Sequence, residues 1–126
     1  ETQVVLPRIK NDFYKLLTSC ANKNLNQIQL EIDNKYFTNV VLASKGYPES
    51  YEKGVEIKGL DKVKNSIVFQ AGTELKNNKL ITNGGRVLSV VSSDSSMKEA
   101  LKKSYLSISK IDFKGKVFRK DIGFDL

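Results

Sequence analysis

Histidine and tryptophan are absent from this chain of 126 residues, which contains one cysteine and two prolines. Without histidine, zinc sites built on imidazole and catalytic triads with a histidine base are excluded. The single cysteine, Cys20, cannot form an internal disulfide, and it falls on the apolar side of a helical pattern, which predicts a small buried side chain rather than a nucleophile. Apolar runs such as Val40 to Ala43 have the length of a strand, so we expect no membrane span, no signal peptide and a cytoplasmic protein.

Positive charge is in excess, because 21 Lys and Arg against 14 Asp and Glu give a net charge of +7. The basic residues are mostly single lysines spread from Lys10 to Lys120, and few arginines are available to hold bases or phosphates with two hydrogen bonds. Solvated surface charge is the first explanation, and an acidic or phosphorylated ligand is the second. A nucleic-acid partner would need the cations on one face with aromatic rings free to stack, such as Tyr36, Tyr47 and Tyr51, and we do not expect one.

Two segments have the apolar spacing of amphipathic helices, residues 8–22 and residues 96–110. The second begins with the capping pattern Ser96 to Glu99. The opening Glu1 to Pro7 starts without Met and turns apolar, which predicts a strand or loop that continues from a missing upstream part. Residues 25–34 fit either a strand or a short helix.

The remaining pattern is that of short strands separated by turns. A hairpin is predicted from Glu74 to Ile81 with its turn at residues 76–79, and the Gly84-Gly85 turn is predicted to lead into a strand over residues 87–91. Further strands are expected at residues 40–44, 55–57, 67–69 and 117–118. The pattern predicts an α+β fold with a mostly antiparallel, partly closed sheet and one packed helix, preceded by a separate leading helix.

Three loops punctuated by glycine carry groups that could bind an anion. They are residues 44–48, 82–86 and 119–123, and their candidate ligand residues are Lys45, Tyr47, Asn83, Gly84, Gly85, Arg86, Arg119 and Lys120. Adjacent glycines allow positive φ and the close approach of a ligand, and an arginine can hold a carboxylate or phosphate with two hydrogen bonds. Arg86 is the first candidate, although Asn-Gly is also a common plain hairpin turn. No phosphate-binding loop or dinucleotide fingerprint occurs, and no metal site is predicted.

Six collinear motifs give the chain a resemblance to a known family. They lie at residues 1–8 (ETQVVLPR), 41–48 (VLASKGYP), 51–60, 68–73 (VFQAGT), 83–88 (NGGRVL) and 119–123 (RKDIG). With these motifs the chain resembles the carboxyl-terminal part of the phosphoribosylamine–glycine ligases, also called glycinamide ribonucleotide synthetases. The resemblance implies that residues 25–126 form a domain like the carboxyl-terminal domain of biotin carboxylase, and that residues 1–24 are the tail of an ATP-grasp domain.

The resemblance also implies a ligase of purine biosynthesis that uses ATP with magnesium or manganese. In this family ATP phosphorylates the carboxylate of glycine, and the amine of 5-phosphoribosylamine attacks the acyl phosphate. Glycinamide ribonucleotide, ADP and phosphate are the products. The loop residues named above, together with Glu1, would contact substrate, and the partners would be the amino-terminal and ATP-grasp domains of the same chain.

Two departures limit what the resemblance implies. The metal-binding Glu and Asn of the family would precede Glu1, so we expect no catalytic residue, no cofactor and no turnover in this chain alone. Gln70 stands where the family usually has His, which weakens any role for this position.

Apolar faces that the missing domains would cover predict a tendency to self-associate. The alternative is a stand-alone module that binds an anionic metabolite without catalysis.

Overall fold

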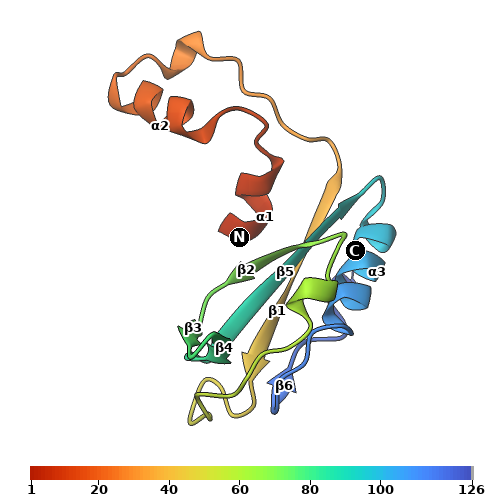
Figure 1. Cartoon of the computed structure of the whole chain (residues 1–126). Coiled ribbons are helices and arrows are strands. Elements are labelled where there is room, and N and C mark those ends of the chain that lie inside the picture. Colours follow the sequence, from red (N-terminus) through yellow and green to blue (C-terminus); the bar gives the residue numbers. More distant parts are fainter. Residues whose placement is uncertain (126) are drawn as a thin grey trace.

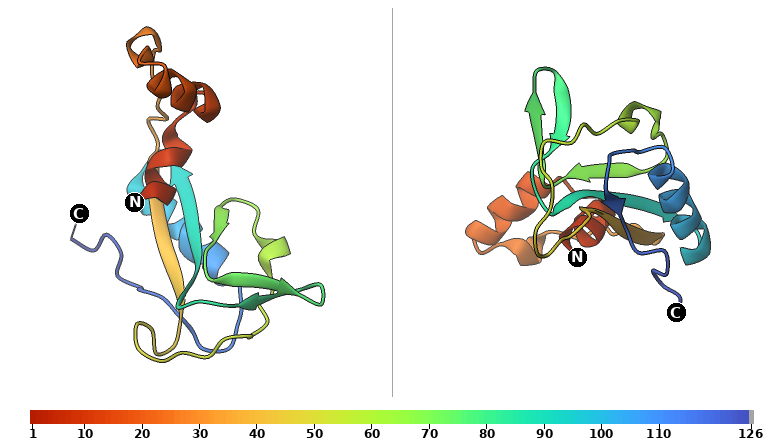
Figure 2. Two further views of the ribbon diagram at one scale, coloured as in Figure 1. Left: turned by 90° about the vertical axis from the view of Figure 1, so that its left-hand side faces the viewer. Right: turned by 90° about the horizontal axis from the view of Figure 1, so that it is seen from below.

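The computed structural model describes residues 1–125 as an amino-terminal arm, residues 1–35, and a sheet-containing body, residues 36–125 (Figure 1). Figure 2 shows that the first helix of the arm lies beside the long strands of the body and that the rest of the arm projects away. Two segments lead to and from the far end of the arm, and they are joined by an antiparallel bridge between Ile9 and Ile32. The arm contains α1 (Thr2–Val5), a 3-10 helix (Leu6–Arg8), α2 (Phe13–Ala21) and a second 3-10 helix (Leu25–Gln27).

The predictions for the arm are partly wrong. Residues 2–8 are helical rather than a strand or loop. The helix predicted for residues 8–22 begins at Phe13, because the Asp12 side chain caps it by accepting a hydrogen bond from the Lys15 amide at 3.3 Å. Cys20 is exposed and not buried, since Leu16 is the one buried residue of α2 and the apolar side of this helix meets little of the described chain.

The body is built on a four-stranded antiparallel sheet with the strand order β2-β5-β1-β6. The strands are β1 (Tyr36–Ser44), β2 (Ile67–Gln70), β5 (Arg86–Asp94) and β6 (Lys116–Val117). The two long strands pair over most of their length, with Val40 opposite Val90 and Leu42 opposite Leu88. These four residues are fully buried, so the centre of the sheet is also the centre of the core.

A separate hairpin of β3 (Thr73–Lys76) and β4 (Lys79–Thr82) confirms the predicted turn. Asn77 and Asn78 both have positive φ. A two-residue hairpin loop favours this conformation at both central positions, and asparagine tolerates it better than most residues. The turn is therefore specified by its own two residues.

Helix α3 (Met97–Ile108) covers one face of the sheet and begins as predicted, with the Ser96 hydroxyl accepting a hydrogen bond from the Glu99 amide at 3.3 Å. Alternate residues of β1 are buried on the side of α3. Five hydroxyl groups form a chain of hydrogen bonds between helix and sheet. In order they are Thr38, Ser104, Ser92, Ser66 and Ser107, and the oxygen–oxygen distances are 3.0, 2.9, 2.7 and 2.6 Å.

The predicted α+β fold class is confirmed, with an antiparallel sheet and a packed helix. The strands predicted at residues 40–44, 67–69 and 87–91 are present with longer bounds, and the last strand lies at Lys116–Val117. The strand predicted at residues 55–57 is reduced to a bridge between Glu56 and Ile81. Residue 126, the end of the predicted carboxyl-terminal domain, lies outside the described residues. No helix within residues 1–125 is long and apolar enough to cross a membrane.

Candidate functional site

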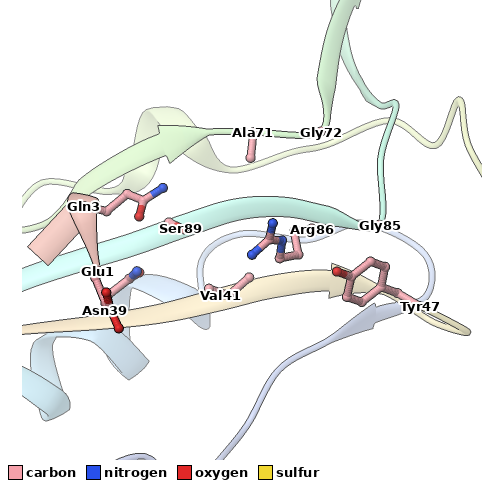
Figure 3. Close-up of a pocket in the computed structure, with 10 residues that line it drawn as sticks. All are labelled: Glu1, Gln3, Asn39, Val41, Tyr47, Ala71, Gly72, Gly85, Arg86 and Ser89. Atoms are coloured by element: carbon pink, nitrogen blue, oxygen red, sulfur yellow. The ribbon is translucent and has the colours of Figure 1, made fainter.

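A cavity of about 520 Å³ lies on the outer face of the sheet, the face that α3 does not cover. Strands β1 and β5 form its floor, and the arm closes it at one end, as Figure 3 shows. Its volume is within the range of small-molecule sites. The lining residues are Glu1, Gln3, Asn39, Val41, Tyr47, Ala71, Gly72, Gly85, Arg86 and Ser89.

A β-bulge directs Arg86 toward this cavity. Leu42 lies opposite Leu88, but the next residue, Ala43, lies opposite Arg86, so Val87 is the extra residue of β5. A bulge of this kind turns the side chains on one side of it to the other face of the sheet. Val87 is consequently fully buried, whereas Arg86 is exposed beside Ala43 and lines the cavity.

The two glycines before Arg86 are required for close packing within the protein. A Cβ at Gly84 would lie 2.7 Å from the Cα of Gly72, and the backbones are tied by a hydrogen bond from the Asn83 amide to the Gly72 carbonyl at 2.7 Å. A Cβ at Gly85 would collide with the Tyr47 ring. Neither Gly84 nor Gly85 is among the residues with positive φ, so the positive φ that glycine allows is not used at this turn, and close packing explains both residues.

Arg86 is the unpaired cation of the cavity. Within residues 1–125 its guanidinium makes no ion pair and no hydrogen bond. In Figure 3 it lies between Val41 and Tyr47 over the outer face of the sheet. The other charged residue of the lining is Glu1, at the arm end. An unpaired guanidinium can hold a carboxylate or phosphate with two parallel hydrogen bonds.

A shallower groove of about 380 Å³ shares Val41, Tyr47 and Arg86 with the cavity and brings Arg119 into the same region. The Arg119 guanidinium donates two hydrogen bonds to the Asp121 carboxylate, at 3.0 and 2.9 Å. This contact lowers the pKa of Asp121 and raises the pKa of Arg119. The groove thus contains two guanidinium groups, one of them already paired with a carboxylate.

The structure brings together five of the nine residues predicted to contact substrate, and it separates the others. Glu1, Tyr47, Gly85 and Arg86 line the cavity, and Arg119 lines the adjoining groove. Lys45 lines a different pocket with Glu52 and Lys114, and Lys120 lines neither the cavity nor the groove. The Asn83 amide donates to the Glu74 carboxylate at 3.1 Å, and Gly84 faces Gly72. Substrate contact remains a prediction for all nine.

Sequence reasoning missed Asn39 and Ser89, which enter the lining from β1 and β5. The Oδ1 atom of Asn39 is buried and has no hydrogen-bond partner within residues 1–125. The signal that could have found these residues is strand alternation, which places Asn39 on the same face as Val41 and places Ser89 on the opposite face from its neighbours Leu88 and Val90. The strand predicted at residues 40–44 began one residue too late to include Asn39.

The residues of this chain do not fit a magnesium site. Within residues 1–125 no three His, Cys, Asp or Glu side chains lie close enough together to hold a metal ion, and Glu1 is the one carboxylate of the cavity. Magnesium is normally held by one or two carboxylates together with phosphates and water. We therefore derive no step through a metal from these residues.

Comparison with known proteins identifies the family. Residues 37–125 match the family model described as "Phosphoribosylglycinamide synthetase, C domain". The chain belongs to this family. The resemblance found in the sequence motifs is thereby confirmed, whereas the division of the chain at residues 24 and 25 remains a prediction.

Relatives similar to this C domain are ligases and multifunctional purine-synthesis proteins. The chain is 46% identical over 127 residues to the bifunctional purine biosynthetic protein purD of Dictyostelium discoideum, covering 98% of this chain and 16% of the relative. It is 44% identical over 122 residues to the phosphoribosylamine–glycine ligase of Caldanaerobacter subterraneus, covering 97% of this chain and 29% of the relative. A solved phosphoribosylamine–glycine ligase from Thermotoga maritima is similar with a TM-score of 0.69 at 34% identity, covering 83% of this chain and 27% of that one. The chain thus spans less than a third of the length of these relatives, in which the matching domain is part of a larger chain.

Proposed function

We propose that this chain is the carboxyl-terminal domain of a phosphoribosylamine–glycine ligase and that it supplies part of the substrate site. The enzyme would join glycine to 5-phosphoribosylamine and form glycinamide ribonucleotide, ADP and phosphate. The observation that carries the proposal is the unpaired Arg86 guanidinium at a cavity of about 520 Å³ in a domain of this family.

Binding and orientation of an anionic group are the tasks that the residues of this chain can perform. Arg86 would hold a carboxylate or phosphate in a fixed direction, and the bulge at Val87 fixes Arg86 in turn. Val41 and the Tyr47 ring would exclude water from one side of the bound group. Exclusion of water strengthens the attraction between guanidinium and anion and protects an acyl phosphate from hydrolysis.

The chemical step needs groups that we assign to the remainder of the ligase. ATP with magnesium would supply the phosphoryl group that activates the glycine carboxylate. In the bond-forming step, the amine nitrogen attacks the acyl carbon, the carbon–oxygen bond to phosphate breaks, and the amine loses a proton. This chain would hold the substrate during that step, and we expect no turnover by the chain alone.

The other domains of the ligase would also cover an apolar groove between α1 and β2. Leu6 and Ile67 are 38% and 48% exposed there, and the groove has a volume of about 490 Å³. Its lining contains no charged residue. We propose that the ATP-grasp domain of the same chain packs on this groove, which is consistent with relatives more than three times as long as this chain.

The test is Arg86→Ala in the full-length ligase, with steady-state kinetics for glycine and for 5-phosphoribosylamine. Loss of a charge-assisted bond costs about 1.5–3 kcal/mol, which is a roughly 10- to 150-fold fall in kcat/KM for the substrate that Arg86 holds. Lys98→Ala, which removes an exposed positive charge on α3, is the control and should change neither value. Unchanged kinetics for both substrates in Arg86→Ala would assign the loop to folding and refute the proposal.

A stand-alone binding module is the alternative function. If the full-length protein binds phosphorylated metabolites through Arg86 but forms no glycinamide ribonucleotide under any condition, the chain functions in binding without catalysis.

A further inference from the structure

The segment after β6 carries Arg119, and it connects the outer-face groove with the opposite side of the sheet. β6 is the edge strand, so the chain that leaves it can pass around the edge. Val117 and Phe118 line the groove with Arg119, and the Phe118 ring also packs on Tyr105 of α3, with ring centroids 6.3 Å apart. Helix α3 covers the inner face, so Tyr105 reaches this segment from behind the groove.

The Tyr105 hydroxyl holds this segment at two points. It donates a hydrogen bond to the Arg119 carbonyl at 3.1 Å and accepts one from the Ile122 amide at 3.4 Å. Two contacts, three residues apart, fix the ends of one turn. Asp121 lies within that turn, where its carboxylate accepts both hydrogen bonds from Arg119.

We infer that Tyr105 is a positioning residue for the anion site, because its hydroxyl fixes the turn that holds Arg119 beside Arg86. The inference rests on the proposed function and adds a residue that does not touch substrate. Arg119 is oriented by Asp121, and Asp121 is placed by the Tyr105 hydroxyl. A guanidinium held in advance need not be reoriented when the anion binds, so its field contributes to binding without a reorganisation cost.

The inference predicts a specific kinetic pattern in the full-length ligase. Tyr105→Phe keeps the ring that packs on Phe118 and removes the hydroxyl alone. We expect the KM of the anionic substrate that Arg86 recognises to rise about 3- to 10-fold, the range for one lost hydrogen bond, with kcat and the KM for ATP within about twofold of the parent enzyme. Tyr36→Phe, at a 55% exposed tyrosine at the start of β1, should change nothing.

A double-variant comparison separates positioning from a general loss of structure. If Tyr105 acts through Arg119, then Arg119→Ala with Tyr105→Phe should raise the KM no more than Arg119→Ala alone. Additive effects of the two changes, or an equal loss for every substrate in Tyr105→Phe, would overturn the inference. A KM equal to that of the parent enzyme in Tyr105→Phe would also overturn the inference.

Arg86→Ala, measured beside these variants, distinguishes the two proposals. If Arg86→Ala impairs the enzyme and Tyr105→Phe does not, the positioning inference fails and the proposed function stands. If Arg86→Ala is without effect while Tyr105→Phe and Arg119→Ala raise the KM non-additively, the proposed role of Arg86 fails and the coupling of Tyr105 to Arg119 stands.

Discussion

Replacement of Ser104 by alanine should destabilise the domain by more than its small change in volume implies. Ser104 is fully buried in α3, and its hydroxyl contacts Thr38 at 3.0 Å and Ser92 at 2.9 Å. Ser92 keeps a second partner, Ser66, at 2.7 Å. Thr38, which is 7% exposed, has Ser104 as the one partner of its hydroxyl within residues 1–125. Ser104→Ala therefore leaves the Thr38 hydroxyl buried and unpaired.

The magnitude follows from these contacts. The lost hydrogen bond to Ser92 contributes about 0.5–1.5 kcal/mol, and the unsatisfied Thr38 hydroxyl costs about 1–3 kcal/mol in place of the second bond, so we expect a total of about 1.5–4.5 kcal/mol. Thr38→Val should cost only about 1 kcal/mol, because Ser104 retains Ser92. In the Thr38→Val background Ser104→Ala leaves no buried hydroxyl unpaired, so the cost of Ser104→Ala should fall by about 1–3 kcal/mol.

The assay is urea unfolding of four proteins, namely the parent, Ser104→Ala, Thr38→Val and the double variant. The midpoints should shift at a constant slope, since the surface exposed on unfolding changes little. The gain in helix propensity on changing serine to alanine occurs in both backgrounds and cancels from the coupling energy. Costs that add within about 0.5 kcal/mol would refute the reasoning that the orphaned Thr38 hydroxyl dominates.

Three further perturbations are predicted by single contacts. Gly85→Ala should destabilise the domain by about 1–3 kcal/mol, because its methyl group would meet ring atoms of Tyr47, and this cost should largely disappear in a Tyr47→Ala background, as measured by urea unfolding. Asn78→Gly should stabilise the domain by up to about 1 kcal/mol and so raise the thermal midpoint, since Asn78 has a φ of +57° and glycine adopts this conformation without strain; an unchanged or lower midpoint would contradict this. The hydrogen bond from Lys103 lowers the pKa of Asp94 to about 2 from 3.8, so stability from this pair is present above pH 4 and is lost as the pH falls through 2. Asp94→Asn should flatten the pH dependence of the unfolding midpoint between pH 4 and pH 2, and a profile equal to that of the parent would exclude the pair as its source.

Elements with local signals were predictable from the sequence. The Asn77-Asn78 turn and the Ser96 cap are specified by residues next to one another, so the hairpin and α3 lie where the pattern placed them. The opposite holds for α1, where Val4 and Val5 favour a strand by propensity and are nevertheless helical. Propensity is a weak preference that tertiary contacts override, and α1 lies against β1 and β5.

The candidate site was predictable only in part, because tertiary contacts and not local sequence place some of its residues. Arg86 follows a Gly-Gly turn, and that chemistry is readable along the chain. Asn39 and Ser89 enter the cavity through the register of β1 and β5, which places Val41 opposite Ser89 and which no local pattern specifies. We expected Cys20 to be buried because an apolar stripe on a helix predicts a surface that covers it. The stripe does not tell which part of the chain supplies that surface, and Cys20 is exposed.

The extra residue in β5 lets two adjacent residues, Val87 and Leu88, both lie in the core while Arg86 keeps its place on the outer face opposite Ala43. Deletion of Val87 would restore plain alternation in β5 and leave Arg86 directly before Leu88, where its side chain still faces the cavity. If Val87 were instead retained and paired with Ala43 without a bulge, alternation would turn Val87 outward and Arg86 toward the core. A deletion of this one residue should therefore cost stability through the lost buried side chain and leave the anion site in place.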